Sequence, residues 1–372
     1  MSDVVIIGSG LSGMLVAREL CAENLSISVV ERASQTGQES SWAGGGIISP
    51  LYPWRYDAAV TRLAQWSQQA YSPLCASLCA DTGIDPQWSQ DGLLIETDEP
   101  EQAIAWAEEF GQPMQAVDNK AMREIEPAFA DPAATGIWMP DVAQVRNPRL
   151  LKALKAFLVQ RGVSFSTGTE ARGFITHRGR VRGLKTSQGD IFAEKVVVAS
   201  GAWSQQLLAT VDQHAPRVEP VRGQMLLFKA RPGLVRRIVL SEQRYIIPRR
   251  DGRILVGSTL EHVGFNKQTT EAAREDLHTA ALKLIPALAE WPMEHQWAGL
   301  RPGSPHGIPY IYEHPEIAGL YVNCGHYRNG VVLGPASAHL LVDQLLGRTP
   351  TLPIAPYSLK GGRPDAEIDA VK

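Results

Sequence analysis

Near its start the chain reads Val4-Val5-Ile6-Ile7-Gly8-Ser9-Gly10-Leu11-Ser12-Gly13. The apolar run predicts a strand buried on both faces of a parallel sheet, and apolar residues at helical spacing follow the last glycine. Gly8 permits the tight turn out of the strand, Gly10 lets the backbone approach a pyrophosphate, and Gly13 lets the helix pack close to the sheet. Because a helix N-terminus offers free N–H groups to phosphates, the stretch predicts a dinucleotide site.

An acidic residue stands where such a site needs one. A second apolar strand, Ile27 to Val30, ends at Glu31, which lies 18 residues beyond Gly13. A carboxylate there accepts hydrogen bonds from ribose hydroxyls, and its charge disfavours a 2′-phosphate. Strand, helix and acid together favour dinucleotide binding over a glycine-rich turn in an α/β fold without a ligand. They do not separate a nicotinamide dinucleotide from a flavin dinucleotide.

Three later segments favour a flavin. Residues 39–48 include three successive glycines, which suit a backbone pressed against a flat ring system; a flexible surface loop is the alternative. Residues 196–204 are another buried strand ending in a small residue and Gly201, which allows the strand end to lie close to the dinucleotide. Residues 325–336 are a turn that precedes an apolar helical pattern. The start of that helix can face the pyrimidine end of a flavin, where negative charge develops on reduction.

With these residues in view, the chain resembles the amino-acid oxidase branch of the FAD-dependent oxidoreductases, which includes D-amino-acid oxidase, sarcosine oxidase and glycine oxidase. It is most similar to the glycine oxidases of thiamine biosynthesis. The matching motifs are residues 4–13, 198–204, 297–303 (Trp-Ala-Gly-Leu-Arg-Pro-Gly) and 325–330 (Gly-His-Tyr-Arg-Asn-Gly). The likeness spans nearly the whole chain.

The resemblance implies FAD as the cofactor. Sarcosine oxidase attaches its flavin to a cysteine, and no cysteine occurs between Trp297 and Tyr312, so we expect noncovalent FAD. The residues expected to bind it are Gly8, Gly10, Leu11, Ser12, Gly13, Glu31, Arg32, Glu39, Ser40, Gly44, Gly45, Gly46, Ala171, Gly201, His326, Tyr327, Arg328, Asn329, Gly330, Val331 and Val332.

The chemistry implied is hydride transfer from the substrate α-carbon to flavin N5, which needs no side chain as acid or base. It does need a cation for the substrate carboxylate, and Arg301 can grip one through two parallel hydrogen bonds. The resemblance adds the hydroxyl of Tyr245 to the carboxylate and places Arg328 near both substrate and cofactor. We expect a backbone role beside the flavin for His326. Tyr52 and Trp54 are candidates for the substrate entrance.

The expected reaction is oxidation of glycine, with sarcosine and small D-amino acids as further substrates. It gives an imine that hydrolyses to a 2-oxo acid and ammonia or an amine, and hydrogen peroxide from molecular oxygen. The family's role in thiamine synthesis is to supply the glycine imine for the thiazole ring. Two alternatives remain: a dehydrogenase that passes electrons to a quinone, and an FAD-dependent enzyme that modifies tRNA.

The expected fold is an α/β, Rossmann-like FAD-binding domain with an α+β substrate domain built on an antiparallel sheet. We assign residues 1–85, 146–216 and 301–355 to the first and 86–145 and 217–300 to the second, with 356–372 as a polar tail. Asn147-Pro148 predicts a helix start with Asn147 as the N-cap. Strands are expected at 224–228, 244–248 and 254–257.

Composition limits the classes of partner that we expect for this protein. The net charge is −3 over 372 residues, which argues against nucleic acid and against the tRNA alternative. No apolar run approaches the roughly 20 residues that span a bilayer, and no secretory signal precedes Val4. The four cysteines form no CxxC pair and suit a reducing compartment. We therefore expect a cytoplasmic enzyme; the sequence leaves open whether it forms a homo-oligomer.

Overall fold

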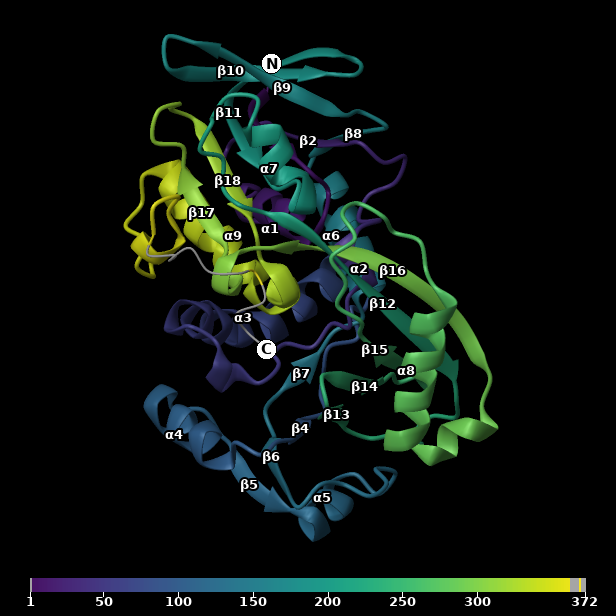
Figure 1. Cartoon of the computed structure of the whole chain (residues 1–372). Coiled ribbons are helices and arrows are strands. Elements are labelled where there is room, and N and C mark those ends of the chain that lie inside the picture. Colours follow the sequence, from purple (N-terminus) through teal and green to yellow (C-terminus); the bar gives the residue numbers. More distant parts are fainter. Residues whose placement is uncertain (1, 362–367, 369–372) are drawn as a thin grey trace.

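The computed structural model describes residues 2–361 and 368. One sheet, in the upper half of Figure 1, lies around the N-terminal strand, which pairs in parallel with strands from both sides. In spatial order its strands are β17 (Tyr310–Glu313), β18 (Leu320–Cys324), β11 (Gly189–Val198), β1 (Ser2–Ile7), β2 (Ile27–Glu31) and β8 (Ser164–Thr167). A ribbon of β9 (Ala171–His177) and β10 (Arg180–Thr186) extends from β11.

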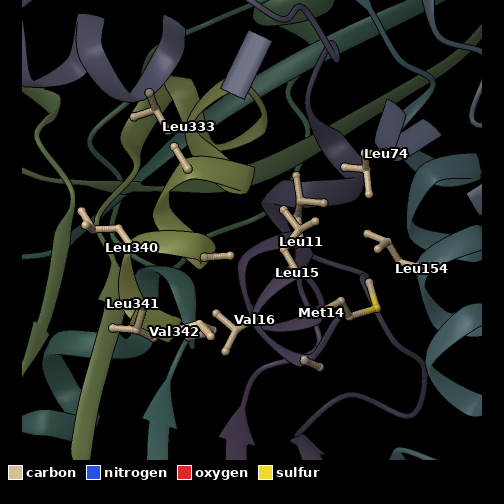
Figure 2. Close-up of a cluster of buried hydrophobic side chains, with 14 of the residues drawn as sticks. Leu11, Met14, Leu15, Val16, Leu74, Leu154, Leu333, Leu340, Leu341 and Val342 are labelled. Atoms are coloured by element: carbon tan, nitrogen blue, oxygen red, sulfur yellow. The ribbon is translucent and has the colours of Figure 1, made fainter. Parts of the chain in front are cut away.

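Helices pack on one face of this first sheet. They are α1 (Leu11–Leu20), α3 (Ala58–Thr82), α6 (Asn147–Gln160) and α9 (Gly330–Leu346). Figure 2 shows Leu11 and Leu15 of α1 beside α9, where a Cβ on Gly334 would lie 2.9 Å from Leu15 and 3.5 Å from Leu11. Leu15 and Leu341 are almost wholly buried. Since one buried side chain of this size contributes about 1.5–3 kcal/mol, this interface fixes the two helices against the sheet and against each other.

A second sheet fills the lower part of Figure 1 and is mostly antiparallel, with a parallel pairing between β13 and β4. In spatial order its strands are β16 (Met293–Gly303), β12 (Glu219–Lys229), β15 (Arg253–Gly257), β14 (Arg244–Pro248), β13 (Ile238–Ser241), β4 (Leu93–Glu96), β6 (Thr135–Met139) and β5 (Gln115–Asp118). The remaining strands and α-helices of the described residues are β3 (Ser89–Gln90), β7 (Ala143–Gln144), α2 (Ser40–Ala43), α4 (Pro100–Phe110), α5 (Asn119–Ile125), α7 (Ser204–Leu208) and α8 (Glu271–Leu284).

The predicted fold class is confirmed: one sheet is parallel at its centre and flanked by helices, and the other is largely antiparallel. The strands expected at 224–228, 244–248 and 254–257 lie within β12, β14 and β15. The domain boundaries stay a prediction. In the described part of the chain, no helix is long and apolar enough to cross a membrane.

Two local expectations need adjustment. Asn147 is not the N-cap of α6; Arg146 caps that helix, and Asn147 is its first residue. In the stretch predicted as a polar tail, Tyr357 is buried, and its hydroxyl donates a hydrogen bond of 2.8 Å to the carbonyl of Ala59. Residues 362–367 and 369–372 of that stretch lie outside the described residues.

The glycines of the first turn allow backbones to touch. Gly8 has a φ of 103°, and a Cβ there would lie 2.4 Å from the carbonyl oxygen of Ala199. A Cβ on Gly13 would lie 2.0 Å from the carbonyl oxygen of Gly8. Side chains at either position would push apart β1, α1 and the end of β11. The task predicted for Gly13, close packing of helix on sheet, agrees with this geometry.

We predict that Gly13→Ala destabilises the protein by about 2–3 kcal/mol through overpacking, although alanine has the higher helix propensity. Chemical unfolding followed by circular dichroism measures this. The control is Gly173→Ala in β9, where the new Cβ would come no closer than 3.7 Å to its neighbours, and whose unfolding free energy should change by less than about 1 kcal/mol. Equal stability of the two variants would contradict the packing argument.

Candidate functional site

A cavity of about 360 Å³ lies where the carboxyl ends of the first sheet face the second sheet. It is lined by β1, β2 and the turn after β11 on one side, and by Met225, Tyr245 and Arg301 of the second sheet on the other. All the residues predicted to bind cofactor or substrate line this cavity except Gly13 and Asn329. Segments more than 300 residues apart in the sequence, such as Gly10 and Gly330, thus meet at one site.

Two helices begin at the cavity. The first residues of α1 (Leu11, Ser12) and of α9 (Gly330, Val331) line it. Neither helix has an N-cap side-chain hydrogen bond within the described part of the chain. The amide of Leu11 instead donates to the hydroxyl of Ser41, 2.9 Å away. Free N–H groups and the positive ends of two helix dipoles make this part of the cavity suited to an anionic group.

Glu31 is held in place by its neighbours at the end of β2. One carboxylate oxygen accepts from the amide (2.9 Å) and the hydroxyl (2.7 Å) of Ser9, and the other accepts from the amide of Ala33 (2.9 Å). A carboxylate has about four acceptor positions. Glu31 therefore keeps acceptor capacity for ribose hydroxyls while its orientation is fixed.

A group of charged and aromatic side chains lies beside Glu31. Glu39 pairs with Arg32 (3.0 Å) and with Lys267 (2.8 Å). The guanidinium of Arg32 lies 3.5 Å from the ring centre of Trp203, which stacks on Phe265. Lys267 and Phe265 come from the loop after β15, so this loop joins the two halves of the molecule at this end of the cavity.

Two buried polar residues hold the glycine loop 44–46 in place. Asn147 donates through its amide nitrogen to the carbonyls of Ser41 (2.9 Å) and Gly44 (3.0 Å). Arg249 donates to the carbonyl of Gly45 at 2.7 Å, and burial lowers the pKa of its guanidinium to about 10. Such bonds to buried carbonyls hold the loop in one conformation.

Arg301 is positioned by backbone and hydroxyl oxygens. It donates to the carbonyls of Thr259 (3.1 Å) and Arg222 (3.4 Å) and to the hydroxyl of Ser258 (2.5 Å). Its guanidinium packs directly over Gly223, where a Cβ would lie 2.3 Å from the terminal nitrogens. Removal from water lowers the pKa of Arg301, and the neighbouring Arg328 lowers it further.

The cavity beside Arg301 is rich in positive charge. Arg328 borders it and belongs to no ion pair among the described residues. Tyr245 is buried, and its hydroxyl donates to the sulfur of Met225 at 3.1 Å. Tyr52 packs in the same apolar cluster as Tyr245, with Arg55 4.3 Å above its ring. Two guanidiniums near one cavity favour an anionic ligand.

His326 borders the cavity, and its Nε2 has no hydrogen-bond partner in the described structure. Burial lowers the pKa of His326 to about 4, so its ring is neutral near neutral pH. The backbone role predicted for this residue stays a prediction. Asn323 of β18 also borders the cavity with both of its amide atoms unpartnered in the described residues.

Sequence reasoning missed several residues of this site. Ser41 lies inside the glycine-rich segment 39–48 but carries no distinct signal. Asn147 was assigned to a helix cap, and Arg249, Ser258 and Asn323 have none of the spacing that marks a motif. Asn323 interrupts an otherwise apolar strand, and a polar residue in such a strand is the one signal that could have singled it out.

The fold and the cavity define a dinucleotide-binding flavoprotein of the oxidoreductase class. The family model described as "FAD dependent oxidoreductase" (DAO) matches residues 3–344. The chain belongs to this family. FAD is therefore its cofactor, and the paired helix N-termini, Glu31 and the buried polar groups without partners in the described structure fit that molecule.

Known proteins match this chain over more than nine tenths of its length. The chain is 48% identical over 361 residues to a glycine oxidase of Pseudomonas putida, covering 96% of this chain and 98% of that one. It is 31% identical to the bifunctional protein ThiO/ThiG of a Nostoc species, covering 92% of this chain and 52% of that protein. The crystal structure of glycine oxidase from Geobacillus kaustophilus matches with a TM-score of 0.91 at 29% identity, over 96% of this chain and 98% of that one.

We predict that His326→Gln flattens the pH dependence of stability between about pH 4 and pH 6.5. In that window the unfolded histidine binds a proton that the folded one, with its pKa near 4, does not. Stability is therefore lost as the pH falls, by up to roughly 3 kcal/mol at pH 4. Urea unfolding across this range measures the effect. Exposed His177, replaced by glutamine, is the control; a His326→Gln curve parallel to it would contradict the assignment.

Proposed function

We propose that this enzyme oxidises glycine, with sarcosine and small D-amino acids as further substrates, and passes the electrons to molecular oxygen. The observation that carries the proposal is Arg301, whose guanidinium is fixed at the cavity by three oxygen acceptors. Arg328, which forms no ion pair among the described residues, borders the same cavity. A guanidinium retains further N–H donors in this arrangement. A monocarboxylate matches the charge of these two guanidiniums.

Arg301 binds the substrate carboxylate and so fixes the α-carbon in the cavity. FAD bound in this cavity would supply the hydride acceptor, flavin N5, and the reaction of reduced flavin with oxygen that gives hydrogen peroxide. The hydroxyl of Tyr245 can turn from the sulfur of Met225 to add a hydrogen bond to the carboxylate. Tyr245 lines this side of the cavity and excludes water from it, whereas Tyr52 and Trp54, the candidates for the substrate entrance, do not line it. No side chain is asked to act as acid or base, in agreement with a neutral His326.

The product is an imine, which water converts to a 2-oxo acid and ammonia, or an amine when the substrate is N-substituted. We further propose that the glycine imine serves thiazole formation for thiamine. The similarity to a bifunctional protein named ThiO/ThiG supports this role.

We propose noncovalent attachment of FAD. Cys324 also borders the cavity. It lies outside residues 297–312, the stretch whose lack of a cysteine led to the expectation of noncovalent FAD. Cys324 lies at the end of a buried strand, on the sheet face opposite to that of Tyr321.

We place the enzyme in the cytoplasm, acting on small molecules rather than nucleic acid. All four cysteines are free in the structure, which suits a reducing compartment, and the net charge of −3 offers no attraction to polyanions. A homo-oligomer is compatible with this proposal.

Peroxide assays across glycine, sarcosine, D-alanine and D-proline test the proposed activity. We expect one peroxide for each glycine consumed, because oxygen is the proposed acceptor. Consumption of glycine without peroxide, together with reduction of an added quinone, would instead identify a quinone-linked dehydrogenase. Absence of turnover with all four amino acids under both conditions would reject the proposed substrate class.

We predict that Arg301→Ala raises the KM for glycine by at least about 30-fold, because losing a buried charge partner costs about 2–5 kcal/mol, while FAD stays bound. Arg301→Lys should recover only part of the loss, since lysine cannot present two parallel donors. The matched control is Arg253→Ala on β15, which pairs with Glu294 away from the cavity. Steady-state kinetics and the flavin absorbance of the purified variants measure both effects; an unchanged KM in Arg301→Ala would remove Arg301 from the substrate site.

A further inference from the structure

Asn323 occupies the carboxyl end of β18 next to the dinucleotide turn. The preceding residue, Val322, pairs in register with Val198 of β11, and Val198 in turn pairs with Ile7 of β1. Asn323 therefore lies at the level of Ala199, where β11 ends, and of Gly8, where β1 ends. It borders the same cavity as these two residues.

The side chain of Asn323 is on the helix face of the sheet. Successive residues of a strand point to opposite faces. Leu320, Val322 and Cys324 pack in the core on one face, whereas Tyr321 packs with α1 and α9 on the other. Asn323 shares the face of Tyr321, and β18 contacts both helices. Its amide is thus directed toward the region where α1 and α9 begin.

Asn323 is 1% exposed, and neither atom of its amide has a hydrogen-bond partner among the residues that the structure describes. Leaving a buried donor or acceptor unsatisfied costs about 1–3 kcal/mol, so an orphaned amide requires an explanation. Gln224, by contrast, makes bonds through both of its amide atoms, and Asn147 donates to two carbonyls although its amide oxygen has no partner in the described structure.

The surroundings select the kind of group that would satisfy this amide. Its nitrogen can donate to an oxygen that also receives backbone N–H groups from the helix starts, as phosphate oxygens do. Its oxygen can accept from a hydroxyl. The ribityl–diphosphate part of FAD carries both kinds of group, whereas the dimethylbenzene edge of the flavin carries neither.

We propose that Asn323 is a further cofactor-binding residue, whose carboxamide hydrogen bonds with the ribityl–diphosphate part of FAD. The residue lies outside the glycine fingerprint and outside the 325–330 motif. It adds a side-chain contact from a third strand, β18, to a region otherwise served by backbone amides. The proposal depends on FAD as the cofactor and not on the identity of the amino acid that is oxidised.

Asn323→Leu and Asn323→Asp test this proposal. Leucine keeps most of the volume but removes both hydrogen-bonding groups, so the Kd for FAD should rise at least about tenfold. Aspartate replaces the donor with a negative charge beside the diphosphate, so its Kd should rise further. Holoprotein is purified, the flavin is removed, and FAD is titrated back while flavin fluorescence is followed. The Tm of each variant is measured with and without FAD.

The two Tm values separate cofactor binding from a purely structural role. Asn323→Leu removes an unsatisfied buried amide, so the Tm of its apoprotein should stay the same or rise while the Tm of its holoprotein falls. Ser337→Ala is the matched control, since Ser337 in α9 is also buried with an unpartnered hydroxyl in the described structure but does not border the cavity. Its Kd for FAD should stay within about twofold of the wild-type value.

Wild-type Kd values for FAD in both Asn323 variants would overturn the proposal, and so would equal losses of Tm in their apo and holo forms. Equal Kd values in the leucine and aspartate variants would also overturn it, because they would indicate that the amide binds a water molecule in place of the cofactor. If Asn323→Leu does not fold, Asn323→Ser replaces it with the same readouts. An increased Kd with an unchanged apoprotein Tm then supports the proposal, and a wild-type Kd rejects it.

Discussion

The site depends on a contact between backbones near the start of the chain. Gly13 lies so close to the carbonyl of Gly8, and Gly8 so close to the carbonyl of Ala199, that neither position has room for a Cβ. This contact sets where α1 begins relative to the ends of β1 and β11. This contact therefore fixes the positions of the free amides of α1 and of the Glu31 carboxylate relative to the cavity. The leucine packing between α1 and α9 then places a second helix start at the same cavity.

The half of the site formed by the second sheet depends on an electrostatic constraint. Arg301 must remain charged in a place with little water, and the second sheet achieves this with oxygen acceptors rather than with a carboxylate. Thr259, Ser258 and the carbonyl of Arg222 hold the guanidinium without cancelling its charge. A partly buried ion pair between Arg222 and Glu261 joins β12 to the segment that carries Ser258 and Thr259. The positive charge therefore stays available for the substrate carboxylate that we propose it binds.

Much of this arrangement could be predicted from local sequence. The turn around Gly10, the acid at Glu31 and the 325–330 motif are short patterns with fixed physical tasks, so the sequence alone was enough to assign their residues to one binding site. Arg249 and Asn323 could not be assigned, because their roles arise from contacts between segments far apart in the sequence. Such contacts produce no periodic pattern in the sequence. A polar side chain in a buried strand is ambiguous until its neighbours, or their absence among the described residues, are known.

The central sheet has a consequence for synthesis of the protein. Its first strand, β1, pairs with β11, and β11 pairs with β18, so strands from the beginning, middle and end of the chain lie side by side. A nascent chain that has emerged only as far as α1 has the glycine turn but lacks the neighbour against which Gly8 packs. Non-local strand pairing of this kind delays folding until the distant partners are available. The pocket is therefore completed only after the ribosome has made most of the polypeptide.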